Sequence, residues 1–371
     1  MTATKGLEGI VAAKSSISSI IDGILTYQGI NIDELAEQAS FEEVAYLLWH
    51  GKLPTQAELD GLIAEFGQYA SIPEEVIAGL RLYPKGSNSM AALRTAVSSL
   101  ALYDSEANDM SNEANYRKAV RLQAQLPTVV AAFARIREGK EPIAPKKGVG
   151  IAQNFLYMLT GEEPAQVAIE AMDKALVLHA DHELNASTFA ARVTIATLSD
   201  IYSGVTSAIG ALKGPLHGGA NEAVMVMLDE IGSLANVEPY IQNKLNNKEK
   251  VMGFGHRVYK NGDPRAKHLM QMSRQLGELK GDMTLYEMSI KIDDLITSQK
   301  GLKPNVDFYS ASCYTMLGIP RDLFTPIFAI SRVSGWTAHI LEQYQDNRLI
   351  RPRAEYVGPL DQHYVPIGKR G

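Results

Sequence analysis

Cysteine is almost absent from this 371-residue chain, which contains Cys313 alone. A single cysteine excludes a disulfide within one chain and a metal site made of several thiolates. It is also typical of a protein that works in a reducing compartment. The start of the chain lacks a basic stretch followed by an apolar core, so we expect no secretory signal and a cytoplasmic location.

Long apolar runs and an excess of positive charge are lacking as well. Apolar runs such as Ile327 to Ile330 are far too short to cross a bilayer, so no membrane role is expected. The 36 basic and 42 acidic side chains give a net charge of −6, which argues against nucleic acid as a partner. The same charge repels anionic substrates, so an anion site needs locally clustered arginine and histidine.

The patterns that are present are those of helices. Two capping boxes, in which a hydroxyl residue precedes a glutamate by three positions, mark helix starts at Ser40–Glu43 and Thr55–Glu58. Alternating β-type runs are scarce, and residues 9–12 are the best candidate. Apolar residues that recur every three or four positions predict longer helices over 90–103, 115–137 and 164–182. We therefore predict a mostly α protein of many packed helices.

Breaks in the helical pattern predict how the chain is divided. Glycine and proline at Gly214–Pro215 precede one joint, and Lys303–Pro304 and Gly318–Pro320 mark another. The breaks bracket about a hundred residues that can move as a unit, so hinge closure is expected. The tail from Arg348 contains three prolines, which predicts an extended arm suited to packing on a partner subunit.

Half of the eight histidines fall between positions 179 and 256. His179 and His182 lie one turn apart on the predicted helix, on the side of Met172 and Leu176, so they are expected to face inward. They either form a buried polar site or only hydrogen-bond within the core. A metal site is also conceivable at residues 179–183, although the H-E-x-x-H spacing is absent.

His217 precedes two glycines and the predicted helix Ala220–Ile231. A histidine beside the positive end of a helix dipole stays neutral and can donate an N–H to a developing oxyanion. The glycines allow a substrate to approach the backbone closely. The plainer alternative is an ordinary glycine hinge with an incidental histidine.

Gly253–His256 begins like a dinucleotide fingerprint, but Val258 occupies the position of the third glycine, so a nicotinamide site is rejected. A glycine-rich turn with basic side chains is instead suited to phosphate or carboxylate, unless it is only a solvated loop. The basic side chains of this loop are Arg257, Lys260 and Arg265.

Asp307 lies between the apolar residues Val306 and Phe308. Desolvation raises the pKa of such a carboxylate and strengthens it as a base, although an aspartate before a helix is more commonly an N-cap. Arg332 and Arg351 suit bidentate carboxylate binding, although surface salt bridges are the usual fate of single arginines.

Six separated blocks together are far more specific: "HADHELNAST", "GALKGPLHGGANE", "MGFGHRVYKNGDPRAKH", "PNVDFYSAS", "ISRVSGWTAHILEQ" and "RLIRPRAEYVG". In this order and spacing they resemble the citrate synthase family, in its bacterial and archaeal branch, over essentially the whole chain. Gln28 stands where many relatives have an arginine. The resemblance implies a two-domain helical fold, with a large domain of residues 1–216 and 319–371 and a small mobile domain of residues 217–318.

The resemblance also implies the chemistry. The enzyme would be an acyltransferase that joins the methyl carbon of acetyl-CoA to the keto carbon of oxaloacetate, then hydrolyses the thioester, at the entry to the tricarboxylic acid cycle. Asp307 would remove the methyl proton, His217 would stabilise the enol, and His256 would polarise the keto group. No cofactor is implied, since the coenzyme A thioester is a substrate.

Binding roles follow from the same resemblance. Oxaloacetate would be held by His182, Arg265, Arg332 and Arg351, the last supplied by the other subunit of a homodimer. Coenzyme A would be contacted by Val251, Met252, Gly253, Phe254, Gly255 and Lys260.

Three rival functions remain open from the sequence. A 2-methylcitrate synthase would use propionyl-CoA with the same residues, since one methylene is worth only about 1–3 kcal/mol of discrimination. A metal-dependent hydrolase would use His179, Asp181 and His182. A non-catalytic CoA-binding regulator is disfavoured because a binding protein needs no catalytic base.

Overall fold

The computed structural model describes residues 5–7, 9–256, 258–259 and 262–370. Within these residues the chain forms sixteen α-helices, five short 3-10 helices and one three-stranded sheet. The prediction of a mostly α protein is confirmed. None of the described helices is both long and apolar enough to span a membrane.

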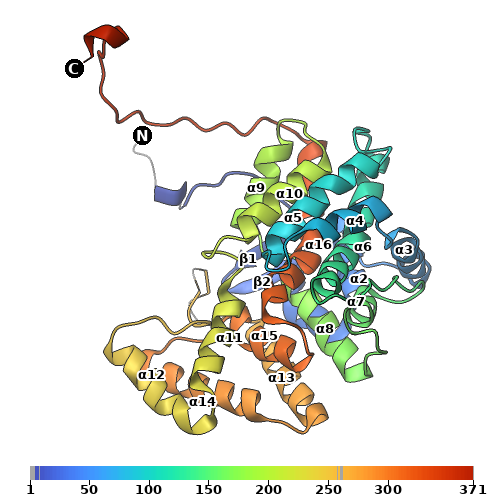
Figure 1. The fold of residues 1–371 in the computed structure, drawn as a ribbon, viewed down its shortest axis with the longest axis vertical. Helices are drawn as coiled ribbons and strands as arrows, with labels where there is room; N and C mark the ends of the chain where they lie inside the picture. The colour runs from blue at the N-terminus through green and yellow to red at the C-terminus, as the bar shows by residue number, and fades with distance from the viewer. Residues whose placement is uncertain (1–4, 8, 257, 260–261, 371) are drawn as a thin grey trace.

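Most of the helices gather in one large lobe, in the upper part of Figure 1. The capping boxes open two of them, since Ser40 and Glu43 exchange hydrogen bonds at one start and Thr55 and Glu58 at the other. Capping satisfies backbone N–H groups that the first turn leaves unpaired. The helices of this lobe are α1 (Ile32–Gln38), α2 (Phe41–His50), α3 (Gln56–Tyr69), α4 (Glu74–Leu82), α5 (Ser89–Leu100), α6 (Asn112–Arg137), α7 (Ile151–Thr160), α8 (Gln166–His179), α9 (Ala186–Ile195), α10 (Ile201–Leu212) and α16 (Phe324–Gln345).

Helix α16 is the axis of the large lobe. Every residue from Phe324 to Ile340 is buried, as expected of a helix that is surrounded on all sides. It contacts α2, α5, α6, α8, α9 and α10, which enclose it in Figure 1. A residue on α16 therefore faces a fixed neighbour, and this rigidity suits the helix to hold site residues in place.

The small lobe lies at the lower end of Figure 1 and is built from residues that follow the Gly214–Pro215 break. Helix α15 contacts α11, α13 and α14 within it, and α13 also contacts α8 of the large lobe. Gly214 and Pro215 thus precede the first helix of this lobe, while the domain bounds of 217–318 stay a prediction. The helices of this lobe are α11 (Ala220–Ile231), α12 (Val237–Asn246), α13 (Ala266–Lys280), α14 (Thr284–Lys300) and α15 (Val306–Met316).

The sheet lies where the sequence analysis did not expect one. Residues 9–12, the predicted strand, form none; the strands are β1 (Ser18–Ile21), β2 (Ile24–Tyr27) and β3 (Ile30–Asn31), paired antiparallel in that order. Asp22 and Gly23 join β1 to β2, and both have positive φ, of 53° and 80°. Asp-Gly is the favoured pair for such a turn, because its backbone twist matches that of the strands.

A second correction concerns the histidines of α8. The helix was predicted to run to residue 182, but it ends at His179, so His182 lies in the loop that follows rather than one turn along the same helix. Glu183 then adopts a φ of 52°, a left-handed conformation that is costly for any residue except glycine. The helix ends early because this loop is bound by neighbouring elements.

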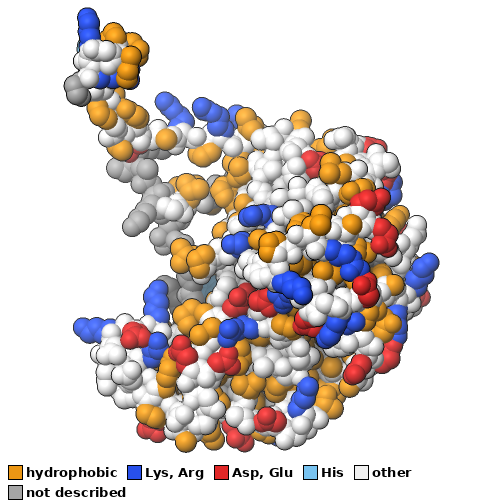
Figure 2. All heavy atoms as spheres, in the orientation of Figure 1, with side chains coloured by type: hydrophobic (Ala, Val, Ile, Leu, Met, Phe, Trp, Pro, Cys, Tyr) orange, Lys and Arg blue, Asp and Glu red, His pale blue; other side chains and the backbone are white. Residues whose placement is uncertain are grey.

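The two ends of the chain leave the large lobe on the same side in Figure 1. From 351 to 370 every residue is exposed, and the only helical turn is η5 (Ile367–Lys369). Figure 2 shows hydrophobic and basic side chains along this tail, whereas acidic and basic groups are interspersed over the body. Tyr356, Leu360 and Tyr364 are among the exposed apolar residues. The remaining 3-10 turns are η1 (Lys5–Leu7), η2 (Ala101–Tyr103), η3 (Leu234–Asn236) and η4 (Arg321–Leu323).

Candidate active site

A cavity of about 350 Å³ lies between the two lobes. It brings together five segments of the chain: the loop after α8, the turn before α11, the loop that carries His256 and Arg265, the start of α15, and the first half of α16. Six of the seven residues predicted to act in catalysis or oxaloacetate binding line it. They are His182, His217, His256, Arg265, Asp307 and Arg332.

Asp307 is the second residue of α15, whose N-cap is Asn305. The plain alternative of an N-cap aspartate is therefore wrong, because the amide side chain of Asn305 accepts the N–H of Asp307 and leaves the carboxylate unused. Its Oδ1 is buried and has no hydrogen-bond partner among the described residues. Burial raises the pKa of Asp307 to about 7, with only partial opposition from Arg265. Such a group can accept a proton near neutral pH.

His217 lies in the turn before α11, three positions ahead of its first residue. Its Nε2 accepts the backbone N–H of Ser187 at 3.3 Å and lies 2.8 Å from the Ser187 hydroxyl. The ring proton therefore resides on Nδ1. Burial, with a contribution from Arg332, lowers the pKa of His217 to about 4, so the ring is a neutral N–H donor at physiological pH.

His256 is held in the opposite tautomer. Its Nδ1 accepts the backbone N–H groups of Val258 at 3.0 Å and Tyr259 at 3.3 Å, so the proton is on Nε2. Burial and the nearby Arg265 lower the pKa of His256. His182 packs edge-on against His256, with ring centroids 5.4 Å apart, and its Nε2 lies 3.0 Å from the Tyr259 hydroxyl. The cavity therefore contains neutral imidazoles.

Arg332 is the strongest candidate for an anion receptor. Its Nε donates to the His179 carbonyl at 2.6 Å, while Nη1 and Nη2 are buried without a partner in the described part of the chain. Burial lowers the pKa of Arg332 to about 10, which keeps it charged at neutral pH. Unpaired buried N–H groups are costly unless a ligand satisfies them. Arg265 differs, because Asp263 pairs with its Nε and Nη2 at 2.9 and 2.8 Å.

A second cavity, of about 590 Å³, lies in the small lobe beside the first. It is lined by the five residues Val251–Gly255 that were predicted to contact coenzyme A, together with Lys248, Lys250 and Lys300. Gly253 has a φ of 82°, and an added Cβ would lie 2.8 Å from the Phe308 side chain, so this turn requires glycine. Lys260, the predicted phosphate contact, lies outside the described residues.

Arg351 is not among the residues that line either cavity. It belongs to the exposed tail, beyond the end of α16. The predicted contact of Arg351 with oxaloacetate is therefore not formed within the single chain and stays a prediction.

The rival metal site receives no support from the geometry. Among the described residues, no group of three or more His, Cys, Asp or Glu side chains is arranged to hold a metal ion. His179 donates its Nδ1–H to the Ala175 carbonyl at 2.7 Å. The carboxylate of Asp181 is engaged by Ser18 and His339 instead of sharing a centre with the two histidines.

Several residues of the site were not anticipated from the sequence. Tyr259 bonds His182, Asp263 pairs with Arg265, and Trp336 donates its Nε1–H to the Ser187 hydroxyl at 3.0 Å. Tyr259 and Asp263 fall in the same glycine-rich loop as His256, so their position was a usable signal. Ser187 and Trp336 lie on different helices, and only the folded chain brings them together.

Comparisons with known proteins agree with this geometry. The family model described as "Citrate synthase, C-terminal domain" matches residues 6–353. The chain is 64% identical to citrate synthase 2 of Bacillus subtilis over the full length of both. It is similar to the crystal structure of a citrate synthase from Pyrobaculum aerophilum, with a TM-score of 0.93, 42% identity and coverage of 98% and 95%.

A further similar structure is the ternary complex of citrate synthase from Thermoplasma acidophilum with carboxymethyl coenzyme A and oxaloacetate. Its TM-score is 0.93 at 37% identity, and the match covers 100% of both chains.

Proposed function

The chain belongs to the citrate synthase family and condenses acetyl-CoA with oxaloacetate, and we propose that the six side chains of the interlobe cavity carry out this reaction. The observation that carries the proposal is the convergence, in one cavity, of a carboxylate whose pKa is raised to about 7 with neutral histidines and an unpaired buried arginine. A base, oxyanion donors and an anion receptor are the groups that a Claisen-type condensation requires.

In the first step Asp307 accepts a proton from the methyl group of acetyl-CoA. The electrons of the broken C–H bond form a C=C bond, the carbonyl π electrons move to the thioester oxygen, and this oxygen takes a share of the Nδ1–H proton of His217, which gives the enol. This tautomer follows from the Ser187 N–H that occupies Nε2. Base and donor must act together, because general acid–base help alone contributes only about 10²- to 10⁴-fold.

In the second step the enol carbon attacks the keto carbon of oxaloacetate. The Nε2–H of His256 polarises the keto oxygen and protonates it as the carbon–carbon bond forms, and the proton that Asp307 removed then replaces the one that His256 gave up. Water then attacks the thioester, releasing citrate and the thiol of coenzyme A. Lobe closure over the substrates excludes bulk water until condensation is complete.

Oxaloacetate enters the cavity as a dianion, although the chain carries a net charge of −6. Arg332 offers Nη1 and Nη2 to one carboxylate, a geometry that favours two parallel charge-assisted hydrogen bonds. His182 and Arg265 contact the remainder. The local cationic cluster thereby overcomes the unfavourable net charge.

Coenzyme A occupies the cavity of the small lobe, where it contacts the protein backbone at Val251–Gly255. Its phosphates lie towards Lys248, Lys250 and Lys300. The small domain, residues 217–318, carries this cavity as well as His217, His256 and Asp307. Closing it over the large domain brings the thioester to bound oxaloacetate.

Thiol release distinguishes the acyl substrates. We expect oxaloacetate-dependent release of coenzyme A to be faster with acetyl-CoA than with propionyl-CoA, and Asp307→Ala to lower the rate by about 10²- to 10⁴-fold. Near-normal turnover by folded Asp307→Ala would refute the mechanism. Faster turnover of propionyl-CoA would instead favour 2-methylcitrate synthesis by the same residues.

The active unit is a homodimer in which Arg351 reaches the partner's oxaloacetate. Support comes from the exposed apolar tail that carries Arg351 away from its own cavity. Subunit exchange tests this, since Asp307→Asn and Arg351→Ala chains are each expected to be nearly inactive alone. A one-to-one mixture is expected to recover about one quarter of wild-type activity, because half the dimers are mixed and each has one complete site. No recovery after verified exchange would place Arg351 in its own subunit's site.

A further inference from the structure

Hydrogen bonds hold the loop that carries His182 at the residues on both sides of it. On one side, the side chain of Asp181 accepts hydrogen bonds at Oδ2 from the Ser18 hydroxyl and from His339 Nε2, the latter at 3.2 Å. On the other side, the backbone N–H of Glu183 donates to Ser18 Oγ at 2.9 Å. One serine of β1 thus bonds both neighbours of a residue that lines the active cavity.

These hydrogen bonds matter because the backbone of the loop is strained. Glu183 has a φ of 52°, and a left-handed non-glycine residue costs about 1–3 kcal/mol unless its surroundings impose it. The hydroxyl of Ser18 holds the N–H of this residue directly. The Tyr27 hydroxyl, from β2, adds a bond to the Asp181 carbonyl at 3.0 Å. The β1–β2 hairpin is therefore a brace for the loop.

The direction of the hydrogen bond between His339 and Asp181 is determined by an arginine. Arg192 Nη1 lies 3.0 Å from His339 Nδ1, and since a guanidinium can only donate, Nδ1 accepts and the ring proton is on Nε2. His339 therefore donates to Asp181. Burial would raise the pKa of Asp181, but His339, Arg332 and Ser18 together hold it below its ordinary value, so it stays an acceptor.

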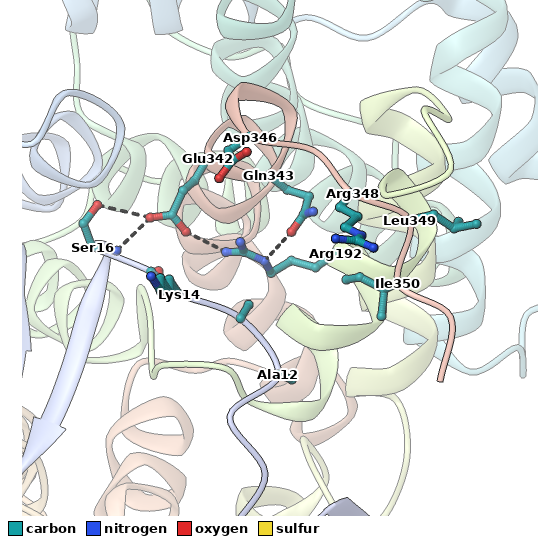
Figure 3. A pocket seen from close by; sticks show the side chains of 12 residues that line it. Ala12, Lys14, Ser16, Arg192, Glu342, Gln343, Asp346, Arg348, Leu349 and Ile350 are labelled. Carbon is teal, nitrogen blue, oxygen red and sulfur yellow. Dashed lines mark hydrogen bonds and ion pairs between the residues drawn. The ribbon is translucent and has the colours of Figure 1, made fainter. Parts of the chain in front are cut away.

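The same series of hydrogen bonds continues to the residues that directly precede β1. Figure 3 shows Arg192 between Gln343 and Glu342, with Glu342 reaching Ser16. Glu342 Oε1 accepts both the backbone N–H of Ser16 at 2.7 Å and its hydroxyl at 3.1 Å. The segment that delivers Ser18 is thereby anchored to α16, the helix that also carries Arg332.

We propose that Ser18 and His339 are positioning residues that hold His182 in the oxaloacetate cavity through its two sequence neighbours. The inference rests on the proposed function, because it takes His182 and Arg332 as ligands of oxaloacetate. Neither Ser18 nor His339 is among the residues that line the cavity. Their loss lets the strained backbone at Glu183 relax and moves the imidazole of His182 away from its place beside Tyr259 and His256.

Ser18→Ala is the first test, measured on the full chain by calorimetric titration with oxaloacetate and by the KM of each substrate. We expect the dissociation constant and KM for oxaloacetate to rise about tenfold, the order expected for losing a hydrogen bond to a charged group. The KM for acetyl-CoA is expected to change less than about twofold. Ser18→Thr keeps the hydroxyl and should restore wild-type values.

Ser19→Ala is the matched control. Ser19 is the next residue of β1, and its hydroxyl hydrogen-bonds to Thr26 within the hairpin at 2.8 Å, with no further partner among the described residues. The variant is expected to leave both KM values unchanged. An increase in the oxaloacetate constants equal to that of Ser18→Ala would assign the effect to general weakening of the hairpin and overturn the proposal.

His339 supplies an independent pair. His339→Gln retains a donor near Nε2 and should bind oxaloacetate close to wild type, whereas His339→Leu removes the donor and should weaken binding like Ser18→Ala. If thermal melting shows that Ser18→Ala does not fold, the two His339 variants test the positioning role by themselves. Folded variants of both residues that bind oxaloacetate within about twofold of wild type would overturn the proposal.

Arg332→Gln separates the two levels of the argument. Loss of oxaloacetate binding in this variant, with normal binding in Ser18→Ala and His339→Leu, would reject the positioning roles alone. Normal binding in Arg332→Gln would reject the proposed oxaloacetate site itself.

Discussion

Asp307 combines two conditions that conflict in an ordinary protein interior: its carboxylate is buried, and one of its oxygens lacks a protein partner. Its folded pKa, about 7, lies above the unfolded value of 3.8. Between these values the folded chain retains a proton that the unfolded chain has lost, so stability falls as pH rises through this window. Above pH 7 the folded chain bears the full destabilisation that comes from ionising the buried carboxylate.

Asp307→Asn is therefore expected to stabilise the protein while it removes the base. At a pH about one unit above the folded pKa, the gain in free energy of unfolding should be on the order of 2–4 kcal/mol and should shrink as the pH is lowered towards the unfolded pKa. Thermal melting across that range measures it. A variant less stable than wild type at every pH would contradict the account of a desolvated carboxylate.

The pH dependence of the rate follows from the same residue. In the proposed mechanism activity requires ionised Asp307, so kcat/KM for acetyl-CoA should fall about tenfold per unit below the folded pKa. His217 stays neutral over this range because its pKa is lowered to about 4. Thiol release measured with oxaloacetate saturating provides the profile. A rate that is flat from about pH 5 to about pH 8 would show that another group is the base.

Among the elements, α16 organises the site through one of its faces. Arg332, Gly335, Trp336 and His339 recur at the three-to-four spacing of a helix, so they point the same way. Arg332 bonds the His179 carbonyl, Trp336 bonds Ser187 beside His217, and His339 bonds Asp181. One buried helix thus sets the relative positions of groups from three other segments.

Gly335 lets this helix approach the His182 loop. An added Cβ would lie 2.5 Å from Asp181 Oδ1 and would press still closer on the Ala180 carbonyl. Gly335→Ala is expected to lower the free energy of unfolding by about 1–3 kcal/mol, although alanine favours a helix by itself. It should also raise the KM for oxaloacetate, because Asp181 must move.

Gly61→Ala is the control for this substitution. Gly61 lies within α3, and an added Cβ there would have no neighbour within 4 Å. Chemical denaturation should find it stabilised by up to about 1 kcal/mol from helix propensity alone. Equal effects at both glycines would show that packing against the loop is not what requires Gly335.

At the scale of the whole molecule, the exposed tail contrasts with the packed body. The residues from 351 to 370 bury nothing within the single chain, yet they include apolar side chains such as Val357 and Leu360. An exposed apolar segment is favourable only when another surface covers it. The exposed tail therefore supports the proposal that it contributes to association of two subunits rather than to the stability of the chain that carries it.

Removal of residues 348–371 tests this division. The shortened chain is expected to retain helix content, since the large lobe loses no buried residue, while its activity falls and its dimer weakens. Circular dichroism, light scattering over a dilution series and thiol release measure these properties. A shortened chain with wild-type activity and an equally stable dimer would contradict the proposed role of the tail.

The helical class, the capping boxes and the breaks at glycine and proline could be predicted because they depend on neighbours within a few positions. The same holds for the burial of Asp307, the proposed base, because its apolar neighbours Val306 and Phe308 in the sequence are buried with it. The hairpin at Ser18–Tyr27 had a local signal in Asp22–Gly23 that went unused. The end of α8 had none, because bonds from β1 and α16 bind the loop that follows.

What the sequence by itself determined is the set of local structures, for which spacing and residue type suffice, while the candidate reactive groups followed from the family resemblance of six separated blocks. Only the tertiary structure decided which imidazole nitrogen carries the proton, which arginine has free N–H groups, and what holds His182. The tautomer of His256 and the pairing of Arg265 are set by residues two or three positions away, whereas for His217, Arg332 and His182 the deciding partners lie in other elements. Hydrogen bonds and burial between such distant segments exist only once the helices have packed.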